Sequence, residues 1–573
     1  MPEAAPQQSS IIETFRAIEA ELTAAGAPFE TTEVEIDGHR VLTYRNAGAT
    51  FHESVADLAT RFADNVLTVD DETRTYADIF ARAARFAGAL RERYGIAVGD
   101  RVGVMMANQS SYLVALLAIT RIGAVAVLYN SRSSATEIAA AFEDVPSTVV
   151  IADPPRIELL RTVDHAATLV STDRIDAELP TVDSLIAETD TDGPVVEAPA
   201  DAPCLILFTS GTSGRAKGVQ LTHRNLVNVV LNMRFVVECN LRIAAHRYGI
   251  AVDDIRALMP PTSALLIFPL FHVSGLAGLI SALNSGGRVA TMRRWDPAVA
   301  VRLIHEHKLT LMSGPPMTVD ELLKQPDAST LLASLVNVTP GGQATPPNLT
   351  AHISDTVPGA QRSNGWGMTE TAGSVCTAGG AVLADFPNTV GPVSPTMRVR
   401  VTDAAGQEVP AGTLGELELS GGLVMAGYID SDGSLTDDHR PWLSTGDLGY
   451  VDEHGLIYLV DRSKDIVICA GENIACSEVE AALMVGDAFT EVAAFGVPDE
   501  RLGEKLVVAV TVDGDRTLDA DDVRDLARET LPPHKIPAEV RFDMSPLPRN
   551  ATGKLVKREL RARYLAQSTA TAD

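Results

Sequence analysis

Strands and helices alternate along much of the chain, and this order constrains the fold more than any other feature of the sequence. A helix with Ala and Leu at helical spacing is expected at residues 76–94. A buried strand at 102–106, a helix at 110–122 and another strand at 124–129 follow it. Since strands separated by helices run parallel in one sheet, we predict an α/β protein with a largely parallel, doubly wound sheet.

The C-terminal part of the chain differs in composition and predicts a second, smaller unit. After about residue 458, short strands and helices in mixed order indicate an α+β unit. The first 50 residues are hard to assign, and residues 236–262 show no clear periodicity. We predict a large N-terminal domain over residues 1–463, whose first 50 residues form an extension of undefined role, and a small mobile domain over residues 464–573.

Composition and charge exclude several classes of protein. Of the 573 residues, 46% are hydrophobic, which is enough for sizeable cores. The net charge of −28 disfavours nucleic acid or an anionic membrane as the main partner, because phosphates attract basic side chains. Five cysteines without a CxxC pair are typical of a reduced, cytoplasmic chain that lacks a zinc site. The N-terminus has no signal-peptide pattern.

Residues 262–283 contain no acidic residue, Lys or Arg over a length that would span a bilayer. Pro269, His272 and Gly275 interrupt this apolar stretch in its middle. We therefore expect a buried strand up to about residue 271, a turn and a buried helix, and no membrane span.

The strongest chemical signal is the segment LFTSGTSGRAKG at residues 207–218. A strand leads into a loop that holds four hydroxyl side chains and two glycines, with Lys217 at its end. Hydroxyls and closely approaching backbone N–H groups bind anions, so a phosphate site is favoured over a flexible connector. A Walker A loop would need glycine at 216 and a hydroxyl at 218, where the chain has Ala216 and Gly218, and this disfavours a P-loop NTPase.

This segment resembles the phosphate-binding signature of the adenylate-forming superfamily, which includes acyl-CoA synthetases, nonribosomal-peptide adenylation domains and luciferases. The chain departs from the family at Ser213, where Thr is usual, and at Ala216, where Pro is usual. Other segments resemble family motifs in the family order, over about residues 50–560: GGQA at 341–344, GWGMTET at 365–371, STGD at 444–447, DRSKD at 461–465, GENI at 471–474 and PRNATGK at 548–554. Each segment alone is compatible with an ordinary turn, and their joint order favours the family.

The resemblance implies roles for single residues. Trp366 would stack on adenine, Thr369 would bond the α-phosphate, and Glu370 would hold Mg²⁺, which prefers oxygen ligands. Asp447 would accept hydrogen bonds from both ribose hydroxyls, and Arg462 would contact ribose or phosphate. The implied ATP- and AMP-binding residues are Thr209, Ser210, Gly211, Thr212, Ser213, Gly214, Lys217, Gly342, Gln343, Gly365, Trp366, Gly367, Met368, Asp447 and Arg462.

Three further residues would serve the two half-reactions that the resemblance implies. Lys554, catalytic together with Thr369 and Glu370, would bridge the carboxylate, the α-phosphate and the ribose while the acyl-adenylate forms. Lys464 would be the hinge about which the small domain turns. Gly471 would then line a channel for the pantetheine arm of coenzyme A.

The implied function is that of an acyl-CoA synthetase. A carboxylate attacks the α-phosphate of Mg·ATP and releases pyrophosphate, and a thiol then displaces AMP from the acyl-adenylate. Coenzyme A is the favoured thiol. A fatty acyl-AMP ligase that loads a carrier protein is the alternative, but such ligases carry an extra segment near the hinge that residues 461–480 lack. A non-catalytic nucleotide-binding protein is disfavoured because the implied catalytic residues are all present.

The acyl pocket is expected near His272, Gly275 and Gly365, whose glycines leave room for a long or bulky tail. A hydrogen-bonded buried histidine is the alternative interpretation of His272. A fatty acid is the favoured substrate, and an aryl, terpenoid or steroid-derived acid is the alternative. ATP and coenzyme A are polyanions, and residues 541–566 carry a local net charge of +5 in an otherwise acidic chain. The sequence leaves the oligomeric state open.

Overall fold

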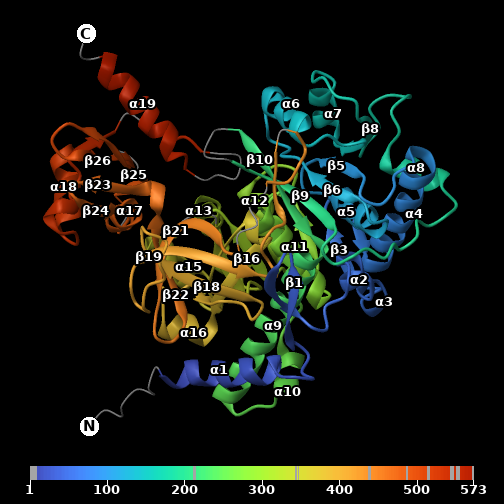
Figure 1. Ribbon diagram of the computed structural model, residues 1–573, viewed down its shortest axis with the longest axis horizontal. Coiled ribbons are helices and arrows are strands. Elements are labelled where there is room, and N and C mark those ends of the chain that lie inside the picture. The colour runs from blue at the N-terminus through green and yellow to red at the C-terminus, as the bar shows by residue number, and fades with distance from the viewer. Residues whose placement is uncertain are drawn as a thin grey trace.

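The computed structural model describes residues 9–210, 215–341, 345, 347–430, 432–436, 441–485, 488–512, 517–542, 547–549 and 555–570. Within these residues, three large sheets, two two-stranded hairpins and the surrounding helices form a large N-terminal body, and a further sheet forms a smaller C-terminal unit (Figure 1). This architecture confirms the predicted α/β class with a small second unit.

The first sheet has the strand order β20-β10-β9-β6-β5-β7-β8. Its strands are β5 (Arg101–Met105), β6 (Val125–Leu128), β7 (Val149–Ala152), β8 (Thr168–Ser171), β9 (Pro203–Ser210), β10 (Ala216–Thr222) and β20 (Gly427–Ile429). The five strands from β9 to β8 are parallel, while β10 and β20 are antiparallel additions at one edge. The edge formed by β9, β10 and β20 supports much of the candidate site described below.

The second sheet has the order β14-β13-β11-β12-β3-β4 and is parallel except for the hairpin of β3 and β4. Its strands are β3 (Val66–Val69), β4 (Thr73–Thr75), β11 (Ala264–Leu266), β12 (Val289–Thr291), β13 (Leu311–Gly314) and β14 (Asn337–Pro340). One hydrophobic core contains side chains from both sheets and from α5 (Ser110–Arg121). Helix α5 is buried along nine consecutive residues, so it has almost no polar face. A sequence that is apolar on every side of the helix shows only a weak helical periodicity.

The remaining N-terminal helices are α1 (Ser9–Thr23), α2 (Phe51–Ala56), α3 (Leu58–Arg61), α4 (Tyr76–Tyr94), α6 (Ala135–Asp144), α7 (Pro154–Leu160), α8 (Val182–Glu188), α9 (His223–Tyr248), α10 (Val252–Leu258), α11 (Val273–Ser285), α12 (Pro297–His307), α13 (Pro316–Leu323), α14 (Ala328–Leu331), α15 (Pro347–Thr356) and α16 (Gly380–Asp385). Helix α4 has the bounds expected from the sequence. A capping box at Thr75 begins it and Gly95, in the left-handed conformation, ends it.

The third sheet is antiparallel, with the order β17-β22-β21-β19-β18. Its strands are β17 (Gly391–Pro392), β18 (Met397–Thr402), β19 (Gly415–Gly421), β21 (Leu443–Val451) and β22 (Leu456–Arg462), and the hairpin of β15 (Ser363–Met368) and β16 (Gly373–Gly379) precedes it. Its inner face joins the same core as the first two sheets. A short helical turn, η1 (Thr369–Thr371), connects β15 to β16.

The C-terminal unit is built on the order β24-β23-β26-β25, with β27 paired to β26. Its elements are η2 (Ser463–Asp465), β23 (Ile466–Cys469), β24 (Glu472–Ala475), α17 (Cys476–Leu483), β25 (Phe489–Asp499), β26 (Gly503–Val512), α18 (Ala520–Arg528), η3 (Pro533–Lys535), β27 (Glu539–Arg541) and α19 (Lys557–Ala570). Two hydrophobic clusters lie wholly within this unit. The domain boundary between residues 463 and 464 stays a prediction, and it falls at η2.

The N-terminal extension and residues 236–248 form one structure that the sequence did not reveal. Residues 31–44 fold into a hairpin of β1 (Thr31–Ile36) and β2 (His39–Tyr44). Helix α9 continues to Tyr248 and so includes residues 236–248, where the sequence shows no clear periodicity. Its residues Phe235, Cys239 and Ile243, four apart, pack in one hydrophobic cluster with α1. The hydrophobic periodicity of α9 is hard to detect in the sequence, because the face opposite this cluster is not polar either.

Strand β11 ends at Leu266, earlier than the strand predicted to reach about residue 271. The side chain of Asn108 takes the place of a strand partner: its Nδ2 donates to the carbonyls of Leu266 and Phe268, and its Oδ1 accepts the N–H of Leu270. Pro269 has no N–H to offer a sheet. The expected buried helix follows as α11, and no helix among the described residues is long and apolar enough to cross a membrane.

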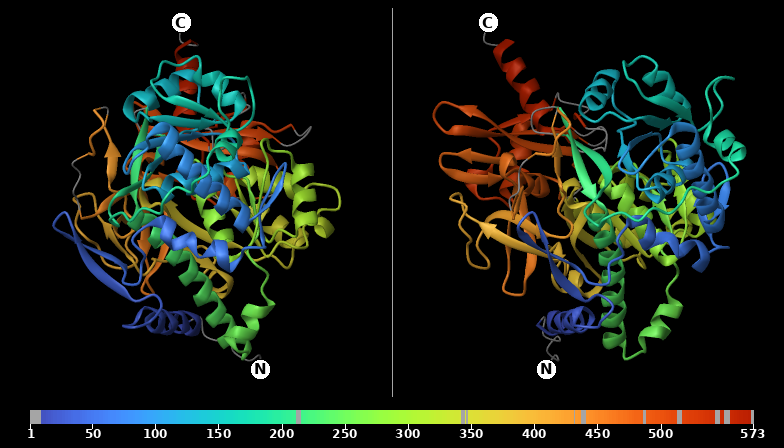
Figure 2. Two further views of the ribbon diagram at one scale, coloured as in Figure 1. Left: turned by 90° about the vertical axis from the view of Figure 1, so that its right-hand side faces the viewer. Right: turned by 45° about the vertical axis from the view of Figure 1, so that its right-hand side comes forward.

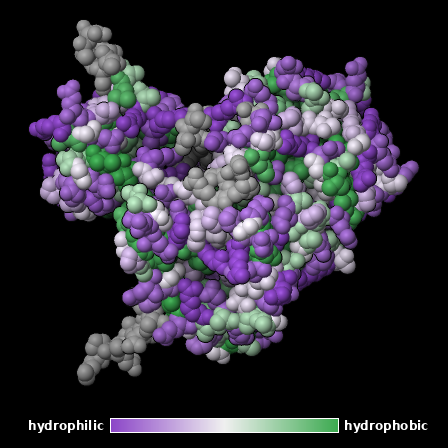
Figure 3. All heavy atoms as spheres, viewed as in Figure 1, coloured by the Kyte–Doolittle hydropathy of each residue, from purple (hydrophilic) through white to green (hydrophobic). Residues whose placement is uncertain are grey.

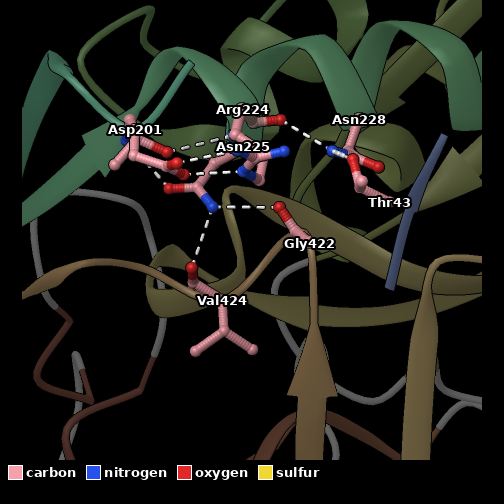
Figure 4. A network of polar contacts seen from close by, with 8 residues as sticks. Thr43, Asp201, Arg224, Asn225, Asn228, Gly422 and Val424 are labelled. Atoms are coloured by element: carbon pink, nitrogen blue, oxygen red, sulfur yellow. Dashed lines mark hydrogen bonds and ion pairs between the residues drawn. The ribbon is translucent and has the colours of Figure 1, made fainter. Parts of the chain in front are cut away.

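A buried polar network fastens the start of α9 to the third sheet (Figure 4). Asn225 donates from Nδ2 to the carbonyls of Gly422 (3.0 Å) and Val424 (2.8 Å). Asn228 donates to Thr43 Oγ1 at 3.0 Å, and Arg224 pairs with Asp201 through two bonds. The loop after β19 is therefore held by side chains of α9, and β20 follows that loop directly.

We expect Asn225→Ala to destabilise the protein, because the buried carbonyl of Gly422 and the half-buried carbonyl of Val424 lose their donor. The expected loss is about 2 kcal/mol, since each unsatisfied buried group costs ~1–3 kcal/mol and relaxation recovers part of it. Urea denaturation followed by circular dichroism would measure the change. Asn240→Ala, at an exposed position of the same helix, is the control. A difference of less than about 0.5 kcal/mol between the two variants would contradict the role of Asn225.

Candidate active site

A large cleft separates the C-terminal unit from the N-terminal body and collects most of the predicted site residues (Figure 3). The predicted residues that line it are Thr209, Lys217, His272, Gly365, Trp366, Gly367, Met368, Thr369, Glu370, Asp447, Arg462 and Lys464. Gly211, Thr212, Ser213, Gly214, Gly342, Gln343 and Lys554 lie outside the described residues, as does the side chain of Ser210. Arg549 and Leu555, which flank Lys554 in the sequence, also line the cleft.

Trp366, Asp447 and Arg462 form one contact set, although the first two are 81 residues apart. The indole N–H of Trp366 donates to Asp447 Oδ2 at 2.7 Å, and Arg462 Nε lies 3.1 Å from Asp447 Oδ1. Strands β21 and β22 place Asp447 directly opposite Arg462. Each carboxylate oxygen can accept a further hydrogen bond, so Asp447 can still bind two hydroxyls. Trp366 is 6% exposed and thus also orients Asp447, a role that the sequence did not suggest.

Glu370 is held by a tyrosine that the sequence analysis missed. The side chain of Glu370 is buried, and its Oε1 accepts a 2.7 Å hydrogen bond from the hydroxyl of Tyr428. The Glu370 carbonyl accepts the N–H of Met425, so backbone and side chain are both fixed by the segment that leads into β20. Tyr428 pairs with Val219 across β10 and β20. Only the placement of β20 beside β10 reveals this contact.

Lys217 is brought to the same place by the β9–β10 hairpin. Its ammonium lies 5.1 Å from the centre of the Tyr428 ring, within the range of a cation–π contact. Residues 209 and 217 face each other across the hairpin, which encloses the predicted phosphate loop. The ammonium of Lys217 and the carboxylate of Glu370 thus both contact Tyr428, next to the place where phosphate is expected.

Arg215 anchors the end of that hairpin and is a second residue that the sequence analysis missed. Its guanidinium bonds both oxygens of the buried Asp144, at 2.6 and 2.8 Å, and Glu143 at 2.7 Å. The hydrogen bonds to Asp144 raise the pKa of Arg215, so the charge of Arg215 is paired with acidic side chains of α6. Arg215 therefore positions the loop and leaves Lys217 as the nearer cation for a ligand.

The predicted acyl pocket is only partly supported by the structure. His272 lines the cleft, and its Nδ1 accepts the N–H of Ser274 at 3.4 Å at the start of α11, so the neutral ring carries its proton on Nε2. Gly365 also lines the cleft. Gly275 does not: a Cβ there would clash with the backbone carbonyl of Pro269, so its small size serves the packing of α11 against the preceding loop.

Several contacts join β22 of the N-terminal body to the C-terminal unit near the predicted hinge, Lys464. Asp461 Oδ2 accepts the N–H of Ser477 at 2.9 Å, and Ser477 Oγ donates to the carbonyl of Val460 at 2.7 Å. Burial raises the pKa of Asp461. These bonds hold α17 against the end of β22, so any rotation about Lys464 must break them.

Lys557 lies close to this junction with its side chain 18% exposed, and it is a structural lysine. Its ammonium lies 2.8 Å from Glu480 Oε1, which also accepts the N–H of Ala494 at 2.8 Å. Burial acts to lower the pKa of Lys557, but Glu480 and other neighbouring acidic groups outweigh it and raise the pKa above its ordinary value. Lys557 is therefore committed to an ion pair, although it lies only three residues after Lys554.

Gly471 lies at the exposed tip of the β23–β24 hairpin and does not line the cleft in this arrangement. Its φ of +86° follows a φ of +52° at Ala470, which is the pattern of a two-residue turn with both residues left-handed. Open space surrounds the position where a side chain would start. The turn thus needs glycine for backbone reasons, and the channel role of Gly471 stays a prediction.

Among the described residues there is no cluster of three or more metal-ligating His, Cys, Asp or Glu side chains. A single carboxylate such as Glu370 suits Mg²⁺, which keeps much of its water and binds substrate phosphates together with one or two carboxylates. Because Tyr428 bonds Oε1, Oε2 of Glu370 is left for an ion. The residues at this edge of the cleft fit a nucleotide bound with Mg²⁺.

Comparison with known proteins agrees with this geometry. The family described as AMP-binding enzyme matches residues 55–429, and its C-terminal domain matches residues 478–554. The chain is 33% identical to a feruloyl-CoA synthase of an Amycolatopsis species, over 86% of this chain and 94% of that protein. It is 32% identical to a 3-[(3aS,4S,7aS)-7a-methyl-1,5-dioxo-octahydro-1H-inden-4-yl]propanoyl:CoA ligase of Rhodococcus jostii, over 88% and 96% of the two chains.

The fold is also similar to that of solved CoA synthetases. The structure of o-succinylbenzoate CoA synthetase from Bacillus subtilis with ATP and magnesium superposes with a TM-score of 0.70 at 25% identity, covering 90% of this chain and all of that one. The same synthetase with its acyl-adenylate intermediate gives a TM-score of 0.71 at 26% identity, covering 90% and 98%. The chain therefore belongs to the AMP-binding enzyme family, as an AMP-forming ligase that joins a small carboxylic acid to coenzyme A and uses ATP with Mg²⁺.

Proposed function

We propose that this ligase activates a bulky, ring-containing carboxylic acid as its acyl-adenylate and transfers the acyl group to coenzyme A. The names of the relatives described above support an acid of this kind, since they specify feruloyl, fused-ring and succinylbenzoate substrates. The fatty acid favoured by the sequence finds no support in these names.

The single observation that carries the proposal is the uncharged character of one group of cleft-lining residues. Phe271, Ala277, Ser281 and Met233 line the same cleft as Gly365, and none of them carries a charge. A neutral, partly apolar wall favours an uncharged hydrocarbon or aryl group and offers nothing to the ammonium of an amino acid.

The side chains at the opposite end of the cleft have separate roles in adenylate formation. Asp447, oriented by Trp366 and Arg462, binds the ribose, and Thr369 and Lys217 contact phosphate oxygens. Glu370 would hold Mg²⁺ together with phosphate oxygens, and the ion would supply positive charge that offsets the charge of the triphosphate. Lys554 stabilises the negative charge that grows on the α-phosphate oxygens when the substrate carboxylate attacks.

The transfer step requires Lys554 to leave and the thiol to enter, which the proposed hinge at Lys464 allows. Release of the bonds between Asp461, Ser477 and Val460 would free the C-terminal unit to turn and bring Gly471 towards the acyl-adenylate. One cleft could then serve both half-reactions. A cytoplasmic location stays a prediction.

A panel of acids tests the substrate class. Initial rates of CoA-thioester formation would be measured with 4-methoxycinnamic acid, 3-phenylpropanoic acid, a fused-ring propanoic acid, and straight-chain acids of four to sixteen carbons. We expect the ring-containing acids to give kcat/KM at least about tenfold above the straight-chain acids, which corresponds to ~1.4 kcal/mol of differential transition-state binding. Higher values for the straight-chain acids would contradict the proposal and restore the fatty acid.

We expect Tyr428→Phe to weaken the metal site without abolishing activity, because it removes only the hydrogen bond to Glu370. A bond to a charged group contributes ~1.5–3 kcal/mol, so the Mg²⁺ concentration for half-maximal rate should rise about tenfold or more. The ring facing Lys217 is kept. Tyr450→Phe, at a position outside the cleft lining, is the control. An unchanged Mg²⁺ dependence in Tyr428→Phe would refute the positioning role.

A further inference from the structure

Two ion pairs flank the segment of the chain that contains Lys554. Arg549 Nε donates to Glu491 Oε1 at 3.1 Å, and a second nitrogen of the same guanidinium bonds that oxygen too. Lys557 Nζ lies 2.8 Å from Glu480 Oε1. One pair therefore comes before Lys554 in the sequence, and the other comes after it.

The two flanks are also joined to each other. Arg549 and Leu555 form an isolated antiparallel bridge, and the N–H of Val556 donates to the carbonyl of Pro548 at 2.9 Å. Residues 550–554 connect the two members of this bridge. The bridge and the two ion pairs thus fix where the segment with Lys554 starts and ends.

Strand β25 receives both flanks. Glu491 belongs to β25, and Glu480, on α17, accepts the N–H of Ala494 in the same strand at 2.8 Å. Apolar contacts hold the flanks as well, because Leu547 and Leu560 share a hydrophobic cluster with side chains of β25. Helix α19 begins at the cleft and leads away from the N-terminal body (Figure 2). The flanks are therefore fastened to the sheet of the C-terminal unit, at its side towards the cleft.

The ion pairs contribute orientation more than stability. Their four side chains line the cleft and are between 17% and 20% exposed, so each pair is partly shielded from water. Such pairs gain little net free energy, because lost hydration offsets the attraction between the charges. The apolar cluster already keeps the flanks on β25. What the pairs add is a fixed direction, since a cation held on one carboxylate oxygen limits how each flank can turn.

We propose that Glu491–Arg549 and Glu480–Lys557 are positioning pairs, which direct the segment with Lys554 into the cleft while the acyl-adenylate forms. We call them the anchor pairs. This inference rests on the role proposed for Lys554 and adds the residues that place it. A displacement of about 1 Å in a catalytic group can cost ~10²-fold in rate, so loss of an anchor pair should slow adenylation. Transfer to coenzyme A does not use Lys554 and should be spared.

Lys557→Met tests the second anchor pair, because methionine keeps an unbranched side chain and removes the charge. With 4-methoxycinnamic acid, ATP–pyrophosphate exchange should fall about tenfold or more. Thioester formation from CoA and the supplied acyl-adenylate should stay within about twofold, since the developing charge on the α-phosphate belongs to the first step alone. Lys557→Arg keeps a cation at this position and should restore most of the exchange rate.

Lys505→Met is the matched control. Lys505 forms a similar ion pair with Glu539 at 3.0 Å in the same unit, and neither residue lines the cleft. This variant loses a half-buried pair but no anchor, so both half-reactions should stay within about twofold of the unmodified enzyme.

A double-mutant cycle separates positioning from a general structural role. In a Lys554→Ala background, Lys557→Met should cause little further loss of exchange, because a positioning residue acts only through the group that it places. A general structural role would lower the exchange rate by the same factor in both backgrounds.

The anchor proposal is overturned if Lys557→Met slows both half-reactions equally, keeps the full exchange rate, or adds its whole effect to that of Lys554→Ala. Glu491→Ala, on the other flank, is tested in the same way if Lys557→Met does not fold. Normal exchange in Lys554→Ala would overturn the role of Lys554 and the anchor pairs with it. Selective loss in Lys554→Ala beside normal exchange in Lys557→Met and Glu491→Ala would overturn the anchor pairs alone.

Discussion

Replacing Glu370 by glutamine should lower the rate of acid-dependent pyrophosphate release by at least about 100-fold. Glutamine keeps the size and can still accept the hydrogen bond from Tyr428, but it removes the charge that holds Mg²⁺. Loss of this electrostatic stabilisation of the triphosphate costs ~3 kcal/mol or more in the transition state. Rapid-quench measurement of pyrophosphate at saturating ATP would give the rate.

Two comparisons make the Glu370 result specific. Glu453→Gln removes a carboxylate that is 86% exposed on the surface, and it should leave the rate unchanged. Excess Mg²⁺ should recover part of the activity of Glu370→Gln, because weakened binding is overcome by concentration. Normal pyrophosphate release by Glu370→Gln at low Mg²⁺ would show that another residue holds the ion.

Lys554→Ala should abolish adenylate formation, with a loss of about 10²–10³-fold, and should spare the second half-reaction. The reason is that a positive charge placed at the developing phosphate charge acts only in the first transition state. Pyrophosphate release would measure the first step, and thioester formation from CoA and a supplied acyl-adenylate would measure the second.

The second half-reaction is the internal control for Lys554→Ala, since a misfolded variant would lose both steps. The nearby Lys557 is not a suitable comparison, because it forms a half-buried ion pair with Glu480. Equal loss of both half-reactions in a folded Lys554→Ala protein would remove Lys554 from its assigned role.

The sequence predicted those features that depend on local order. Helix α4 has its expected bounds because a capping box and a terminal glycine mark its ends. The strands of the first sheet are apolar and bounded by turns, so the parallel class could be predicted. The motifs that hold Trp366, Glu370 and Asp447 could be predicted as well, since each is a short segment.

Features that depend on distant parts of the chain could not be predicted. Nothing local links Tyr428 to Glu370, because the contact exists only when β20 pairs with β10. The extent of α9 was missed because Phe235, Cys239 and Ile243 are matched by apolar residues on the opposite face of the helix. Gly275 was misjudged because a small residue can either leave space in a pocket or allow a close backbone contact. Only the three-dimensional structure distinguishes the two roles.

ATP–pyrophosphate exchange in the absence of CoA tests the central claim most directly, namely that this cleft forms an acyl-adenylate. With a ring-containing acid we expect exchange that depends on both the acid and Mg²⁺, and sustained AMP release only after CoA is added. Exchange without acid, or hydrolysis to ADP and phosphate, would contradict the account.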